Sequence, residues 1–151
     1  MLRQAFTVRL KQAMKAPEIR TVSTIRLILA ELKDRDIAAR GRGNTEGIAD
    51  VEIQRMLQTM IKQRRDSILL YEQGKRGDLA QQECEEIAVI EGYLPHQLDQ
   101  SEIEAAIAAA IGETGAAEVK DMGPVMGVLR ERYDGVIDVA RAGAIAKRLL
   151  G

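Results

Sequence analysis

The sequence is poor in residues that cross-link or anchor small folds. Among its 151 residues there is one cysteine, Cys84, and no tryptophan, and aromatic residues make up 3% of the chain. A single cysteine excludes an internal disulfide framework and a zinc site of the usual cysteine spacing. No apolar run approaches the roughly 18 residues that span a bilayer. We therefore expect a cytoplasmic protein that does not enter the membrane, with an aliphatic core.

Groups that carry out catalysis are scarce as well. The only histidine, His96, follows Pro95 and has no evident partner for a catalytic triad. Cys84 stands between Glu83 and Glu85, whose charges disfavour the reactive thiolate. No glycine-rich phosphate-binding motif occurs. We therefore predict no catalytic residue, no metal ligand and no cofactor, which favours a binding module over an enzyme.

The net charge of −1 hides an uneven distribution. Residues 1–76 contain 16 Lys and Arg against nine Asp and Glu, whereas residues 77–151 contain six against 14. Such a split can mark a half that faces nucleic acid, or the two halves can complement each other. In the basic half, Lys62, Arg65, Lys75 and Arg76 are the candidate contacts to a polyanion.

Apolar residues recur every three or four positions along the chain, and nothing alternates at period two, which predicts an all-α protein. The expected helices cover about 1–16, 19–39, 50–73, 78–91, 101–114, 121–134 and 138–150. Four aspartates and one Ser-x-x-Glu capping box are expected to cap them: Asp50, Asp78, Asp121, Asp138 and Ser101–Glu104. Pro95 must interrupt the helices. We predict a four-helix domain over 1–95 and a three-helix domain over 96–151.

The first 17 residues are basic and contain no acid, as in an organelle transit peptide. However, Leu2, Phe6, Leu10 and Met14 recur at spacing four on one helical stripe. This pattern favours the first helix of the fold.

Arg64 stands where the stripe of the third expected helix requires a core residue. An unpaired buried charge is strongly unfavourable, so an inward-facing arginine needs a partner. We hypothesise that Arg64, together with Arg26, pairs with Glu83, Glu86 or Glu31 at a helix interface. The alternative is that this polar gap is a binding face.

Gly123 and Gly127 are four residues apart and share one helical face. Another backbone, from a packed helix or an RNA sugar-phosphate chain, can approach closely there. Lys120 and the free N–H groups at the start of this helix would suit a phosphate. Asp121, in contrast, would cap those donors and repel an anion, so tight helix packing is the alternative interpretation.

Several motifs occur in a specific order. They are Thr24-Ile-Arg26, Lys62-Gln-Arg64-Arg-Asp-Ser67, Tyr93-Leu94-Pro95-x-Gln97-Leu98, Asp121-Met-Gly-x-Val-Met-Gly127 and Gly135-x-x-Asp138. In this order they resemble the GatB/YqeY family, and in particular its stand-alone YqeY-like members. The resemblance covers nearly the whole chain.

The resemblance implies an all-α protein whose counterpart forms the tail of the B subunit of the glutamine-dependent aminoacyl-tRNA amidotransferase. That tail helps to hold the misacylated tRNA. We therefore expect a non-catalytic, tRNA-associated accessory module, with tRNA or amidotransferase subunits as partners. One alternative is a protein-interaction module that docks a partner helix. Another, from the family label alone, is a carbon–nitrogen ligase with glutamine as amido-N-donor.

Overall fold

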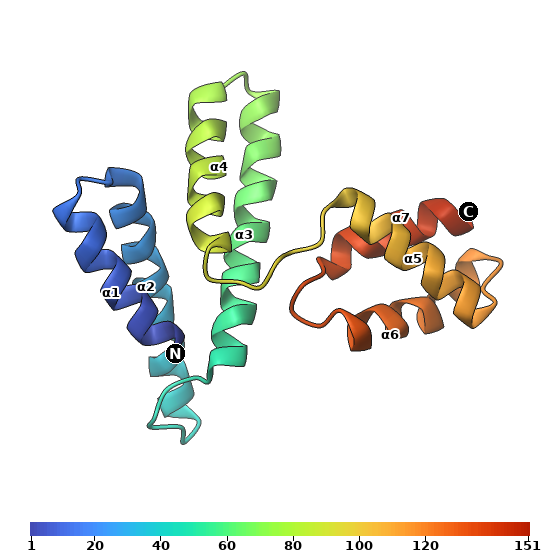
Figure 1. Ribbon diagram of the computed structural model, residues 1–151, viewed down its shortest axis with the longest axis horizontal. Helices are drawn as coiled ribbons and strands as arrows, with labels where there is room; N and C mark the ends of the chain where they lie inside the picture. The colour runs from blue at the N-terminus through green and yellow to red at the C-terminus, as the bar shows by residue number, and fades with distance from the viewer. The chain divides into compact units, whose positions relative to one another are not determined.

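The computed structural model describes all 151 residues and contains α-helices, one short 3-10 helix and no strand (Figure 1). The all-α prediction is therefore confirmed. The helices are α1 (Leu2–Lys15), α2 (Ile19–Gly41), α3 (Asp50–Gln73), α4 (Gly77–Glu91), α5 (Gln100–Thr114), the 3-10 helix η1 (Val119–Asp121), α6 (Met122–Arg132) and α7 (Val139–Leu150). None of them is both long and apolar enough to cross a membrane.

The chain divides into two compact units, Met1–Leu94 and Pro95–Gly151. The first contains α1 to α4, and the second contains α5 to α7 with η1. The division into two domains, 1–95 and 96–151, stays a prediction.

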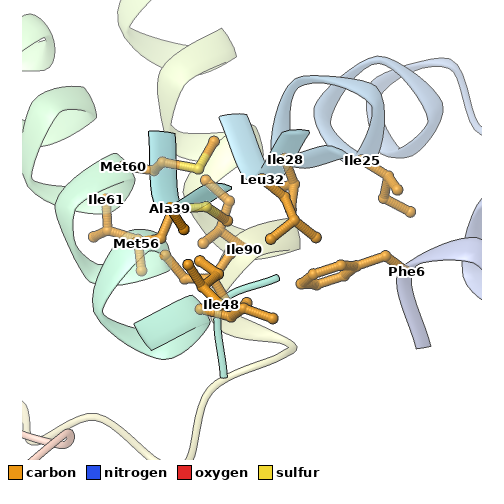
Figure 2. Packing of buried hydrophobic residues seen from close by; sticks show 12 residues of the cluster. Phe6, Ile25, Ile28, Leu32, Ala39, Ile48, Met56, Met60, Ile61 and Ile90 are labelled. Carbon is orange, nitrogen blue, oxygen red and sulfur yellow. The ribbon is translucent and has the colours of Figure 1, made fainter. Parts of the chain in front are cut away.

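The core of the first unit is aliphatic apart from one aromatic ring. Phe6 of α1 is completely buried and points into a cluster that includes Ile28 and Ile90 (Figure 2). Its ring also meets Tyr93 edge-on, with centroids 4.8 Å apart. Burying such a side chain stabilises the fold by roughly 2–3 kcal/mol. The basic N-terminal segment is thus a helix of this fold, as its apolar spacing predicted. The predicted stripe is wrong at its last member, because Met14 is 56% exposed and Ala13 is buried instead.

Four of the five predicted helix caps differ from the structure, and the first two concern α5 and α3. The capping box of α5 uses Asp99 and Glu102 rather than Ser101 and Glu104: Glu102 N donates to Asp99 Oδ1 at 2.8 Å, and Asp99 N donates to Glu102 Oε1 at 3.4 Å. Asp50 does not cap α3 either. Its carboxylate accepts a hydrogen bond from the backbone N–H of Leu2 at 3.4 Å, which ties the start of α3 to the start of α1.

The remaining predicted caps also have mixed outcomes. Asp138 caps α7 as expected and accepts from Arg141 N at 3.2 Å. Asp78 makes no cap, because the N-cap position of α4 is Arg76 and Asp78 lies within the first turn. Arg76 binds both carboxylate oxygens of Asp78 at 3.1 Å.

The second unit has its own aliphatic core, to which all three helices contribute. The fully buried members include Ile103, Ile107, Val125, Leu129 and Ala142. The segment before α5 is fastened to the loop between α6 and α7. Gln97 Nε2 donates to Gly135 O at 3.0 Å, and Leu98 N donates to Val136 O at 2.9 Å. The Tyr-Leu-Pro-x-Gln-Leu motif therefore has a structural explanation: its first two residues pack on the first core, and its last two hold the second unit together.

Candidate nucleic-acid interface

Gly123 and Gly127 lie on the outer face of α6. Both are exposed, and a Cβ built at either position meets no atom within 4 Å. The helix packs on α5 and α7 through its opposite face, which carries Val125, Met126 and Leu129. The interpretation of the two glycines as a tight helix-packing site is therefore wrong, because their bare backbone faces outward.

The two glycines have different local explanations. Gly123 is helical and precedes Pro124, and a Cβ before proline disfavours the helical conformation. Gly127 lies in the helix interior with no proline after it, where glycine costs about 1 kcal/mol relative to alanine. No contact in the structure accounts for this cost. Gly127 is thus the more informative of the pair.

Cations lie at both ends of this bare face. Lys120 is exposed, with its Nζ 3.2 Å from Glu118 Oε2. Arg130 is exposed and forms no ion pair. Sequence reasoning missed Arg130, although its position three residues after Gly127 and seven after Gly123 places it on the same face. We call the surface formed by Gly123, Pro124, Gly127 and Arg130 the α6 ridge.

Asp121 does not cap α6, contrary to expectation. Its Oδ2 accepts hydrogen bonds from the backbone N–H groups of Ala117 and Glu118, both at 3.0 Å, and these bonds hold the pKa of the carboxyl group below its usual value. The start of α6 is not an open phosphate site either. Met122 N donates to Val119 O in η1, and Pro124 has no N–H to offer. These two features leave fewer free donors at the start of α6 than the sequence suggested.

The four basic residues chosen in the first half do not form a cluster. Lys62 is exposed on α3 and free of ion pairs. Lys75 is exposed in the turn after α3, with the left-handed φ of 56°. Lys62 and Lys75 are 13 positions apart, which corresponds to about 20 Å along a helix. Arg65 Nη2 lies 3.5 Å from a carboxylate oxygen of Glu91 on α4.

The fourth of these residues, Arg76, is occupied by Asp78 through both of its carboxylate oxygens. Lys62 and Lys75 are therefore the members with free charge. Part of the charge asymmetry of the sequence is neutralised inside the first unit, where acids of α4 pair with bases of α2 and α3. These pairs are Arg20–Glu85 at 3.1 Å, Arg64–Glu86 at 2.9 Å and Arg65–Glu91 at 3.5 Å.

Arg64 lies between α3 and α4 with its charge compensated. Its side chain is 13% exposed, and Nε donates to Glu86 Oε2 at 2.9 Å, while Nη1 donates to Met60 O at 3.1 Å. Glu83 is farther away, at 4.0 Å from Nε. Burial raises the pKa of Glu83, and the neighbouring charge of Glu86 adds to this effect. The polar gap in the stripe is thus an ion pair between two helices.

Arg26 does not join this ion pair, contrary to our hypothesis. It is exposed on α2 and forms no ion pair, and Glu31, its other candidate partner, binds Arg35 at 3.0 Å. Ile25, Ile28 and Leu32 form the buried side of α2. Arg26 lies 100° beyond Ile25 around the helix, outside that buried side. Arg26 is therefore a motif residue without a structural role in this fold.

The remaining candidates for chemistry are the single histidine and the single cysteine. His96 Nε2 lies 3.0 Å from Glu102 Oε1, and this hydrogen bond raises the pKa of the imidazole. Cys84 is exposed on α4. No three His, Cys, Asp or Glu side chains come together as a metal site would need.

Three curated relatives, all named "Altered inheritance of mitochondria protein 41, mitochondrial", are similar to this chain. The protein from Clavispora lusitaniae is 38% identical over 93 residues, which cover 62% of this chain and 51% of the relative. Those from Kluyveromyces lactis and Lachancea thermotolerans are 32% and 33% identical, over 56% of this chain and 43% of each relative. The chain thus spans about half the length of the curated relatives it matches.

These names contradict the expectation of a cytoplasmic protein, because all three relatives are mitochondrial. The family itself is established over almost the full length of the chain. The profile described as "Yqey-like protein" matches residues 3–150, which include the motifs of both units. The chain therefore belongs to the YqeY-like family.

Proposed function

We propose that this chain is a non-catalytic module that binds folded tRNA, with the α6 ridge as its main contact. The observation that carries the proposal is the exposed Gly127. Glycine lowers the stability of the helix at this position, and no packing contact compensates for that loss. A missing side chain lets a ribose-phosphate backbone approach the helix closely. Arg130, free of ion pairs, lies one turn away and can pair with a phosphate.

The chemistry of the ridge suits the shape of a folded RNA better than an unstacked strand. Single-stranded RNA is usually held by aromatic side chains that stack on the bases. The second unit has one aromatic residue, Tyr133, and it packs against the core. A-form RNA instead presents phosphates and 2′-hydroxyl groups over a shallow minor groove, which a bare helix flanked by cations can contact. Lys62 and Lys75 of the first unit are exposed and outside any ion pair, so each is able to contact a phosphate, a type of contact that carries no base specificity.

A binding experiment tests the proposal with a tRNA transcript and a matched pair of variants. Gly112, in α5, is also an exposed glycine inside a helix with no atom within 4 Å of its Cβ position. Gly127→Gln should weaken tRNA binding about tenfold, whereas Gly112→Gln should leave it unchanged. Arg130→Gln should weaken binding and reduce the log–log salt slope by about one.

The same experiment separates tRNA from a protein partner at this ridge. Affinity for tRNA should fall steeply between about 50 and 200 mM salt, because phosphate contacts release counterions. If the wild-type chain does not bind tRNA at low salt, or if Gly127→Gln and Gly112→Gln behave alike, the tRNA proposal is wrong. The protein-interaction alternative would then be favoured, because an apolar partner interface responds little to salt.

A further inference from the structure

The outward side of α2 carries free cations at a regular spacing. Arg26, Lys33 and Arg40 follow one another at seven-residue intervals, and each is exposed and outside any ion pair. Seven residues are close to two helical turns, so the three charges run along one side of the helix about 10 Å apart. We call the surface formed by Ile19, Ser23, Arg26, Ala30, Lys33, Ile37 and Arg40 the α2 outer face.

The acids near this face are mostly engaged elsewhere. Glu31 binds Arg35, and Asp36 binds Arg3 across to α1. Arg40 forms no ion pair with Asp36 but lies near enough for its charge to help lower the pKa of that carboxyl group. Glu18, just before α2, is held by both guanidinium nitrogens of Arg9 at 2.9 and 2.8 Å. The one acid of α2 outside an ion pair is Asp34, next to Lys33. The α2 outer face therefore keeps a positive net charge, which calls for a negatively charged partner.

Apolar side chains lie among these cations. Ile19 is 81% exposed, and Ile37 is 55% exposed. At the N-terminal end, a hollow of about 320 Å³ opens between the end of α1 and the first turns of α2. Its lining includes Met14, Pro17, Ile19, Val22 and Arg26. Its lining is mainly apolar, with Arg26 as its uncompensated charge.

We propose that the α2 outer face docks an acidic amphipathic helix of a partner protein. An apolar side chain of that helix would fill the hollow, and carboxylates at seven-residue spacing would meet Arg26, Lys33 and Arg40. RNA fits this face less well, because its solvated phosphates would lie against the exposed isoleucines. The proposal gives Arg26 a function that the fold does not, and it involves a different unit and surface from the tRNA proposal.

The probe is a synthetic amphipathic peptide of about 20 residues, with leucines along one stripe and glutamates at seven-residue spacing beside it. A second peptide carries lysines in place of the glutamates. We expect the full-length protein to bind the acidic peptide, measured by fluorescence anisotropy, and not the basic one. The double variant Arg26→Glu, Lys33→Glu should weaken binding of the acidic peptide at least tenfold and gain affinity for the basic peptide.

The matched control is Lys11→Glu on α1, because Lys11 is also exposed and outside any ion pair. It reverses one charge away from the α2 outer face, as the single variant Arg26→Glu does on that face, and it should leave peptide binding as in the wild type. Thermal unfolding of each variant shows that the fold is kept. The proposal is overturned if the acidic peptide does not bind, or if the double variant binds it like the wild type. It is also overturned if an RNA duplex displaces the peptide and loses its own affinity for the double variant.

Discussion

Arg3 and Asp36 form a two-point ion pair between α1 and α2, with Nη1–Oδ2 at 2.6 Å and Nη2–Oδ1 at 2.8 Å. The same pair holds the loop that leads to α3. Arg3 Nη2 donates to Ile48 O at 2.8 Å, and Ile48 N donates to Asp36 Oδ1 at 2.9 Å. One carboxylate thus joins two helices and the α2–α3 loop, although these groups are distant in the sequence.

We expect Asp36→Ala to destabilise the protein by about 2 kcal/mol, because hydrogen bonds to charged groups contribute most when several converge. The bond to Arg3 lowers the pKa of Asp36 in the folded state, and Ile48 N–H contributes as well. The ionised carboxylate therefore stabilises the fold above the unfolded pKa near 4, and this contribution is lost as the pH falls through the lower folded pKa.

Urea unfolding of both proteins between pH 7 and pH 3 measures this difference. The gap between wild type and Asp36→Ala should be constant near neutral pH and should close in acid. Asp34→Ala is the control, because Asp34 is an exposed acid on the same helix and outside any ion pair. A gap that persists unchanged at pH 3 would show that the carboxylate charge is not the source of stability.

The two glutamates beside Arg64 should respond in opposite directions to neutralisation. Glu86→Gln removes the charge that lies 2.9 Å from Arg64, and breaking such a pair should cost about 3 kcal/mol. Glu83, at 4.0 Å, has its pKa raised by burial and by Glu86. A raised pKa means that ionised Glu83 is unfavourable in the folded state at neutral pH.

Glu83→Gln should therefore raise the free energy of unfolding at pH 7, by less than about 1 kcal/mol. This gain should vanish as the pH falls below the pKa of Glu83 in the unfolded chain, because Glu83 is then protonated in both the folded and the unfolded state. Both variants replace one carboxylate oxygen by an amide nitrogen, at positions three residues apart on α4. Each therefore serves as the control for the other. Equal destabilisation by both would contradict the assignment of Glu86 as the partner of Arg64.

The fate of the two arginines shows what helical periodicity can predict. Arg64 interrupts a stripe of core residues at regular spacing, so its inward direction and its need for a carboxylate could be inferred from the sequence. Arg26 only neighbours such a stripe, and a shift of one residue turns a side chain by 100°. Periodicity places Ile25 on the stripe and Arg26 beside it, so the predicted pairing of Arg26 goes beyond what the pattern supports. The packing of α2 against α1 and α4 buries Ile25 and leaves Arg26 exposed.

The start of α5 was ambiguous for a different reason. The sequence contains two overlapping capping boxes, Asp99-x-x-Glu102 and Ser101-x-x-Glu104, and each satisfies the same local rule. The choice depends on a distant contact, the hydrogen bond from Leu98 N to Val136 O, which keeps the chain extended up to Asp99. A local pattern contains no information about that contact.

The turn between α3 and α4 should be stabilised by removing a side chain. Lys75 has a φ of 56°, in the left-handed region where a Cβ is unfavourable by about 1–2 kcal/mol. Lys75→Gly removes this strain but increases the freedom of the unfolded chain, so we expect a net gain of about 0.5–1 kcal/mol. Thermal unfolding measures it, with Lys62→Gly in the regular part of α3 as the contrasting variant, which should destabilise by about 1 kcal/mol.

The exposed glycines of α5 and α6 provide a test of stability that is independent of any ligand. Because a Cβ at Gly112 or at Gly127 meets no atom within 4 Å, both Gly→Ala variants should gain helix propensity and stabilise the isolated chain by about 0.5–1 kcal/mol. Urea unfolding of the two variants, each compared with the wild type, measures this gain. Only Gly127→Ala should weaken tRNA binding, because the proposal assigns contact with the RNA backbone to the bare position 127 and no such contact to Gly112. A loss of stability in Gly127→Ala alone would show that this face is covered within the folded chain, which would remove the basis for a ligand there.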